Sequence, residues 1–541
     1  MLRVWLYRFA RDRKANIAAT FAGRQDSTVR RPMGLRHFVG DTRGNIAVIF
    51  AIACIPLLSG VGCALDYALA TRMKSKLQAA TDAAAVGAIS QGSPAYVAAG
   101  QMGSTGSVSA GNTDASNLFY ANIGGVTGYS NLVVTPNVTK TNTNITATVS
   151  FTADVPTVFL GLLGYKKLSI SGSSQAAGSL PMYLDFYLVL DVSGSMGLPS
   201  TSAEAVRMQS INPDNYRQYP TGCTLACHFS PQNSACTDSG TQGYPTNNYC
   251  MGYAISRVSQ AGYQGLLSTN HNNPMGVQLP SSMVSGLPNS LYNSLTPVSN
   301  CPTAGTDSCI QLRLDAVGYA VNQLFTTANN SEKLPQQFRI GLYPFIRYLD
   351  TSYFPLTSSI NGSPTNPSTI NYAAANLASL LDTNMDTNLG SGGTHIDTAL
   401  SSMSTSIVSV GNGSASSNTL PYIFLVTDGA QDPQVKGVPN GGWSGSNHAT
   451  TINASTVCTP IKNRGIVISI LYIPYQKINP VNASFANDED DYANNNIPNI
   501  PPSLQACAST GFFYTANTPQ DITNALNQMF NHALITAHIT N

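Results

Sequence analysis

Residues 183–196 read YLDFYLVLDVSGSM, an apolar run that ends in a loop of small polar residues. The uninterrupted apolar run predicts a strand that is buried on both faces of a sheet. A second run of this kind, LPYIFLVTDG at residues 420–429, also ends in polar residues. Buried strands that alternate with helices are typical of a parallel sheet with helices on both faces. These two stretches therefore predict a doubly wound α/β domain.

The segments around these strands continue the alternation, and we assign the whole region 181–541 to this domain. Helices are expected at 311–325, 396–408, 456–465 and 519–534, and further strands at 338–346, 466–475 and 511–516. Residues 198–308 interrupt the pattern with a stretch rich in Gly, Asn, Ser and Pro that also contains cysteines. A plain connection of that length is uncommon, so we expect a disulfide-rich insertion there.

The N-terminal part of the chain has the pattern of a membrane anchor. Residues 1–43 carry ten Lys and Arg against three Asp and Glu, which predicts a basic cytoplasmic tail. Ile46–Leu65 contains no charged residue, and twenty helical residues span roughly 30 Å, the thickness of a bilayer core. The Ala-, Leu- and Lys-rich residues that follow predict a stalk helix, so residues 44–90 form a transmembrane and stalk helix. Everything after Asp66 is then expected outside the cytoplasm.

Residues 91–180 are predicted to form a small β-rich domain. Residues 91–130 are rich in Gly, Ser and Ala and are interpreted as loop. Residues 131–171 alternate β-branched and polar residues, which predicts three or four short strands.

Polar side chains gather where the two buried strands end. Asp191, Ser193 and Ser195 follow the first strand, and Asp428 follows the second. In a doubly wound sheet, ligand sites form at the carboxyl ends of the strands. Carboxylate and hydroxyl oxygens are hard ligands that suit Mg²⁺ best, with Mn²⁺ or Ca²⁺ as alternatives. Too few charges converge to close the ligand shell, which leaves positions for water or a partner.

A third element, Ser391-Gly-Gly-Thr394, precedes the helix expected at 396–408. The three elements, in this order within residues 183–535, closely resemble the metal-ion-dependent adhesion site of von Willebrand factor A domains. The resemblance implies that one divalent cation is surrounded by five residues: Asp191, Ser193, Ser195, Thr394 and Asp428. It also implies that an acidic side chain of a partner completes the metal shell.

The N-terminal segment resembles a second family. Residues 43–51 (RGNIAVIFA), the pair Asp66-Tyr67 and residues 76–85 (KLQAATDAAA) are similar to the TadE/TadG-like proteins of Flp (tight-adherence) pilus assembly. The combination with an A-type domain points to the TadG-type member. That implies a single-pass protein of the bacterial inner membrane with periplasmic C-terminal domains and pilus-assembly proteins or pilin-like subunits as partners. Only apolar residues and Asn45 follow Gly44 closely, so we expect an uncleaved anchor.

Three functions compete for these features. The leading hypothesis is a membrane-anchored scaffold of pilus assembly that binds partners through the metal; the alternative is a surface adhesin that uses the same site. A metal-dependent hydrolase would need a general base beside the ion, and the sequence offers none, so we expect no enzyme. Cys223-Thr-Leu-Ala-Cys227-His228 departs from the C-x-x-C-H spacing of haem attachment, and a disulfide is the better interpretation. No nucleic-acid partner is expected.

Overall fold

The structure is a computed structural model that describes residues 45–202, 311–382, 386–438, 441–446, 448–477 and 491–539. The chain forms two compact units, which are described separately. The first comprises Met1–Ala70 with Pro156–Leu168, and the second comprises Thr71–Val155 with Ser169–Asn541. The basic tail and nearly all of the predicted disulfide-rich insertion lie outside the described residues. The predicted domain boundaries stay predictions.

One long helix, α1 (Asn45–Ala88), contains both the predicted span and the predicted stalk. Its first half exposes large apolar side chains from Val48 to Leu65. Among the described residues, this helix is long and apolar enough to cross a membrane. Its second half buries side chains at intervals of three or four residues, among them Met73, Leu77 and Ala84. This spacing gives the helix one buried face in the second unit.

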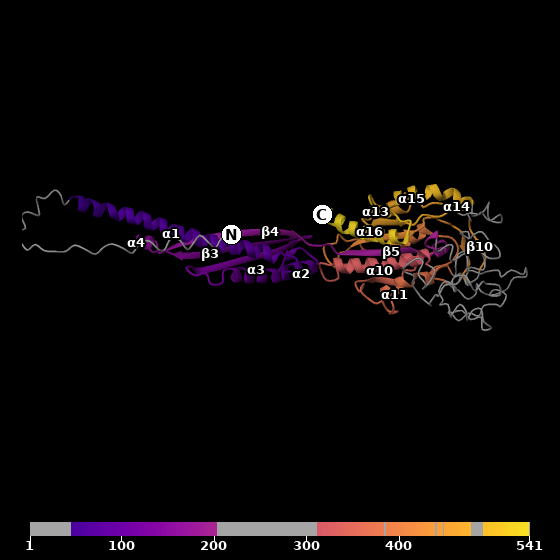
Figure 1. The fold of residues 1–541 in the computed structure, drawn as a ribbon, viewed down its shortest axis with the longest axis horizontal. Coiled ribbons are helices and arrows are strands. Elements are labelled where there is room, and N and C mark those ends of the chain that lie inside the picture. Colours follow the sequence, from indigo (N-terminus) through magenta and orange to yellow (C-terminus); the bar gives the residue numbers. More distant parts are fainter. Residues whose placement is uncertain are drawn as a thin grey trace, which may run out of the picture. The chain divides into compact units, whose positions relative to one another are not determined.

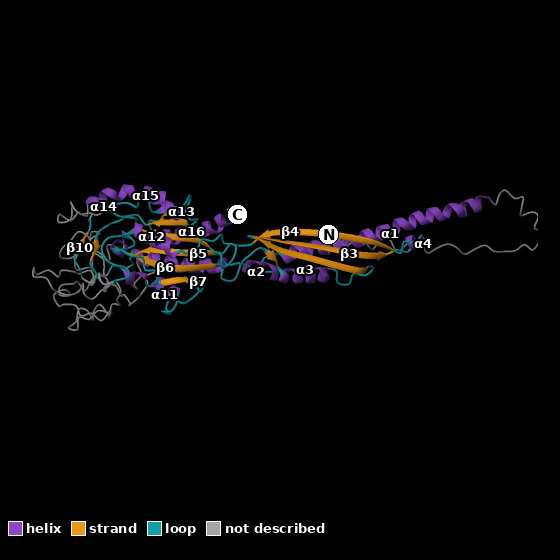
Figure 2. Cartoon of the chain, turned by 180° about the vertical axis from the view of Figure 1, so that it is seen from behind, coloured by secondary structure: helices purple, strands orange, loops and turns teal. Residues whose placement is uncertain are grey.

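The second unit begins with a four-stranded sheet in the order β1-β2-β3-β4. Its strands are β1 (Gly106–Ser107), β2 (Ser130–Thr141), β3 (Asn144–Pro156) and β4 (Lys167–Ser179). Strand β2 pairs antiparallel with both β1 and β3. The prediction of strands here is confirmed, but β2, β3 and β4 are 12 to 13 residues long rather than short, as Figure 2 shows.

The prediction of a loop over residues 91–130 is wrong, because two helices form there: α2 (Pro94–Gln101) and α3 (Ser109–Asn122). Ser93 caps α2 by accepting a hydrogen bond from the Tyr96 N–H, and Pro94 opens the first turn. Tertiary packing stabilises helix α3. Phe119 is fully buried, and a Cβ at Gly111 would lie 2.9 Å from the Val138 side chain, so the helix packs closely on β2. Tertiary contact therefore overrides a weak local pattern.

The rest of the second unit contains a six-stranded sheet in the order β12-β11-β8-β5-β6-β7 (Figure 1). The strands are β5 (Leu184–Asp191), β6 (Phe338–Phe345), β7 (Phe354–Thr357), β8 (Leu420–Thr427), β11 (Val467–Tyr472) and β12 (Phe513–Thr515). All neighbours are parallel except β7, which pairs antiparallel with β6 at one edge. The doubly wound parallel sheet is thus present, with an antiparallel edge strand that the sequence analysis missed.

Helices cover both faces of this sheet. One core contains side chains from α10 (Arg313–Ser331), α11 (Ile370–Ala375) and α16 (Pro519–Ile539). The other contains side chains from α12 (Ile396–Ser406), α13 (Cys458–Asn463) and α15 (Ile500–Cys507). A short helix, α4 (Phe159–Leu162), lies between β3 and β4 in the first unit. The second unit also contains a short strand pair, β9 (Val435–Lys436) and β10 (Trp443–Ser444), and the helix α14 (Asp491–Asn496). A disulfide joins Cys458 to Cys507 across the second core.

Candidate metal site

The site lies where two central neighbouring strands end. Strands β5 and β8 are parallel and in register, with Leu190 opposite Val426. The next residues, Asp191 and Thr427, therefore end their strands side by side, and both are buried. The Thr427 hydroxyl donates a 2.6 Å hydrogen bond to Asp191 Oδ2. The carboxyl ends of these two strands thus bring polar side chains into contact.

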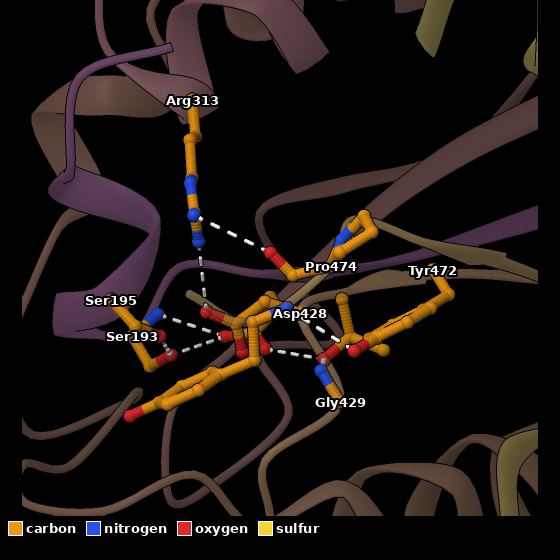
Figure 3. A network of polar contacts seen from close by, with 10 residues as sticks. Ser193, Ser195, Arg313, Asp428, Gly429, Tyr472 and Pro474 are labelled. Atoms are coloured by element: carbon orange, nitrogen blue, oxygen red, sulfur yellow. Dashed lines mark hydrogen bonds and ion pairs between the residues drawn. The ribbon is translucent and has the colours of Figure 1, made fainter. Parts of the chain in front are cut away.

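The loop after β5 folds back on the Asp191 carboxylate. Oδ1 of Asp191 accepts hydrogen bonds from the Ser193 N–H at 3.0 Å and from the Ser193 hydroxyl at 2.6 Å. The Ser195 hydroxyl lies 3.4 Å from the Ser193 hydroxyl, on the 3₁₀ turn Gly194–Gly197. Three of the five predicted residues are thus brought together, as Figure 3 shows for the two serines.

Asp428 is a buried carboxylate that has an arginine as its ion-pair partner. Its side chain is fully buried, and neither carboxylate oxygen accepts a hydrogen bond of normal geometry from a described residue, although the Ser195 hydroxyl and the Ala430 N–H lie close enough to interact with it. Its nearest charge is the Arg313 guanidinium, whose Nη1 lies 3.5 Å from Asp428 Oδ2 (Figure 3). Burial raises the pKa of Asp428, and Arg313 acts in the opposite direction. A buried carboxylate without hydrogen bonds is costly unless another group compensates its charge.

The two carboxylates also act on each other. Burial, followed by the negative charge of Asp428, raises the pKa of Asp191 to about 7. Hydrogen bonds from Ser193 and Thr427 oppose that increase. A divalent cation between the two side chains would offset both the burial cost and the mutual repulsion. The donor set is therefore consistent with a hard cation, with Asp191, Asp428 and the serine hydroxyls as its ligands.

The third predicted element is held by contacts of its own. The backbone of Thr394 pairs with Asp432, and its side chain makes no hydrogen bond to a described residue. The preceding glycines adopt left-handed conformations, and a Cβ on Gly393 would lie 2.3 Å from the Asp432 carbonyl oxygen. Asp382 holds this turn by accepting hydrogen bonds from the Ser391 hydroxyl and the Gly392 N–H, both at 3.0 Å. The role of Thr394 as a ligand stays a prediction.

Sequence reasoning missed Arg313 and Thr427 as members of this cluster. Arg313 begins α10 and is 3% exposed, although it stands between Leu312 and Leu314 in the sequence. A charged residue within an apolar stretch was the available signal. The described residues contain no group of three or more His, Cys, Asp or Glu that could hold a metal, because this cluster has only two carboxylates.

A family model matches one segment of the chain. Residues 44–99 match the model described as "Putative Flp pilus-assembly TadE/G-like". The matched segment contains the long apolar helix and the start of the second unit. No curated protein matches the chain.

Three solved structures resemble the chain weakly. The pilus adhesin SpaC from Lactobacillus rhamnosus GG is 12% identical, with a TM-score of 0.29, over 76% of this chain and 35% of SpaC. The PilB minor pilin from Streptococcus sanguinis is 10% identical, with a TM-score of 0.28, over 75% of this chain and 78% of PilB. The vWF domain of the type V pili tip protein Mfa5 from Porphyromonas gingivalis is 10% identical, with a TM-score of 0.28, over 66% of this chain and 97% of that domain. The chain thus spans about a third of the length of SpaC, and scores this low do not establish a common fold.

Proposed function

We propose that this chain is a membrane-anchored interaction protein of Flp pilus assembly that binds a partner through one divalent cation. The α1 segment Ile46–Leu65 anchors it in the bacterial inner membrane, with the basic tail in the cytoplasm and the second unit in the periplasm. The cation, Mg²⁺ in the first place, is held by five residues: Asp191, Ser193, Ser195, Thr394 and Asp428. The role is binding rather than catalysis.

One observation carries the metal-binding part of this proposal. Both carboxylate oxygens of Asp428 are buried without a hydrogen bond of normal geometry, at the end of the strand next to the one that carries Asp191. An exposed carboxylate would be solvated, and a structural one would accept hydrogen bonds. Two buried carboxylates beside serine hydroxyls instead favour a cation, and a bound cation with an open coordination position accepts an acidic side chain of a partner.

The pilus part of the proposal has separate support. Residues 44–99 match the pilus-assembly family model, and the first half of α1 exposes apolar side chains along its length. Exposed apolar side chains along twenty helical residues suit a lipid environment.

The test compares the wild-type chain with two aspartate variants in a strain that lacks the native copy. Asp191→Ala removes a proposed ligand. Asp350→Ala is the matched control, because Asp350 accepts from the Ser352 N–H at 2.8 Å and from its hydroxyl at 2.6 Å in an equivalent surface turn. We expect Asp191→Ala to lose pili and to lose co-purification of pilus proteins, while Asp350→Ala keeps both.

Chelation completes the design. Co-purification with the full-length wild type should disappear in EDTA and return when excess Mg²⁺ is added. Partner proteins that still co-purify with both wild type and Asp191→Ala in EDTA would contradict the proposal. Normal piliation with lost surface adhesion would instead assign the same site to an adhesin.

A further inference from the structure

The connection between β3 and β4 carries a dense group of exposed apolar side chains. Residues 157–166 read TVFLGLLGYK. Exposed fractions are 69% for Val158, 84% for Leu162, 59% for Leu163 and 67% for Tyr165. Single exposed apolar residues are common on proteins, but a contiguous group of them marks a surface that another phase or molecule covers.

This loop is fixed to α1 within the first compact unit. The Asp66 carboxylate accepts hydrogen bonds from the backbone N–H groups of Val158, Phe159 and Leu160 at 3.1, 2.8 and 2.7 Å. One turn earlier, a Cβ on Gly62 would lie 2.3 Å from Phe159 Cγ, so the ring packs directly on the helix backbone. The apolar loop therefore has a defined position along α1.

The loop also has a defined internal shape. The N–H groups of Leu163 and Tyr165 both donate to the Leu160 carbonyl oxygen at 3.0 Å. At the base of the loop, the Thr157 N–H donates to the Lys166 carbonyl oxygen at 3.2 Å. These bonds satisfy part of the turn's backbone groups internally, which favours an apolar environment.

The loop contacts α1 at Gly62 and Asp66, where the apolar run ends and polar residues begin. Gly62 lies three residues before Leu65, the last residue of the uncharged segment, and a helix rises 1.5 Å per residue. The contact with Phe159 is therefore roughly 5 Å inside the end of the proposed span. Tyr165 and Lys166 follow the apolar tip, and aromatic and basic side chains favour the headgroup region.

We propose that residues 157–166 insert into the outer interfacial layer of the lipid bilayer beside the span, held there by Asp66. The bilayer is the occupant because the exposed side chains of the loop are continuous, in the same compact unit, with the exposed apolar surface of α1. This inference rests on the proposed membrane anchoring of Ile46–Leu65. The loop gives the protein a second membrane contact that fixes how deep the helix sits.

Tryptophan quenching by brominated lipids tests the insertion. The chain has two tryptophans, Trp5 and Trp443, and both are replaced by phenylalanine in the full-length background. Leu162→Trp reports on the loop, Leu57→Trp on the span, and Val408→Trp, at a 91% exposed position in the second unit, on solvent. Each variant is reconstituted into phosphatidylcholine vesicles with and without bromine at the 6 and 7 positions of one acyl chain.

Fluorescence of Leu57→Trp and Leu162→Trp should fall at least twofold in brominated vesicles, while Val408→Trp stays unchanged. Quenching at Leu57→Trp without quenching at Leu162→Trp would overturn the loop insertion and leave the anchor intact. Absence of quenching at both positions would overturn the anchor and the insertion together. Protection of Leu162→Trp that depends on the protein-to-lipid ratio would assign the loop to contact with a second copy, and would also overturn the proposal.

Discussion

Removal of the Arg313 charge should make the stability of the second unit depend strongly on Mg²⁺. Arg313 is 3% exposed and Asp428 is fully buried, and the guanidinium is the nearest positive charge to that carboxylate. Arg313→Met keeps much of the side-chain volume and removes the charge. The Asp428 carboxylate then stays buried without a compensating cation.

The magnitude follows from this geometry. Removing one partner of a buried ion pair costs about 3–5 kcal/mol. The contact of 3.5 Å includes no hydrogen bond, which places the expected loss at the lower end of that range. For a domain of this size the loss lowers Tm by roughly 4 °C. Mg²⁺ at a hundred times its Kd should restore about 2.7 kcal/mol, because it supplies the missing positive charge.

Differential scanning calorimetry of the full-length chain in detergent, at about pH 8 with EDTA or excess Mg²⁺, provides the measurement. Arg339→Met is the matched control. Arg339 pairs with Asp185, which is 4% exposed, through two contacts of 2.7 and 2.6 Å at the opposite end of β5. Its loss should also lower Tm, and Mg²⁺ should raise that Tm only by the amount it adds to the wild type, because Arg339 is not beside the metal site.

An equal increase of Tm with Mg²⁺ in Arg313→Met, Arg339→Met and wild type would refute this reasoning. It would mean that the Arg313 charge does not affect how tightly the cation binds. An unchanged Tm in EDTA for Arg313→Met would show that Arg313 does not compensate the Asp428 charge.

Three further predictions concern the second unit, and each uses the Tm of the full-length chain. Replacing Cys458 and Cys507 together with serine should cost about 2–4 kcal/mol of stability, and a Tm unchanged from that of the oxidised wild type would contradict this. Gly318→Ala should destabilise by about 1–3 kcal/mol, because the new methyl group would lie 2.3 Å from the Ala374 carbonyl oxygen; an increase in Tm would mean that α10 shifts freely. In EDTA, Tm should fall as the pH rises from about 4 to about 7. The reason is the raised pKa of Asp191, because the folded chain then binds this proton more tightly than the unfolded chain. A Tm that rises over that interval would contradict the raised pKa of Asp191.

The sheet and one pair of buried carboxylates could be predicted from sequence because their signals are local. The apolar runs before Asp191 and Asp428 are long enough to indicate buried strands, and the polar residues follow each run directly. Parallel pairing then brings the ends of neighbouring strands together without further information. The same reasoning gave the long helix α1 from its lack of charge and its Ala-rich continuation.

Other features depend on contacts between distant segments. Arg313 meets Asp428 only because α10 packs beside the end of β8, and no local pattern indicates that pairing. Helix α3 forms in a Gly- and Ser-rich stretch because Phe119 packs in a buried core. The residues that form this core are distant in sequence, so no local pattern indicates it. The apolar loop that contains Leu162 lies within residues 131–171, which the sequence analysis assigned to strands, and its attachment to Asp66 needed the structure.

The most direct test of the account is isothermal titration of the full-length, chelator-stripped chain with Mg²⁺. We expect one ion per wild-type chain, the same binding in Asp350→Ala, and no measurable binding in Asp191→Ala. Wild-type binding that is matched in stoichiometry and affinity by Asp191→Ala would contradict the central claim that a divalent cation is held between Asp191 and Asp428.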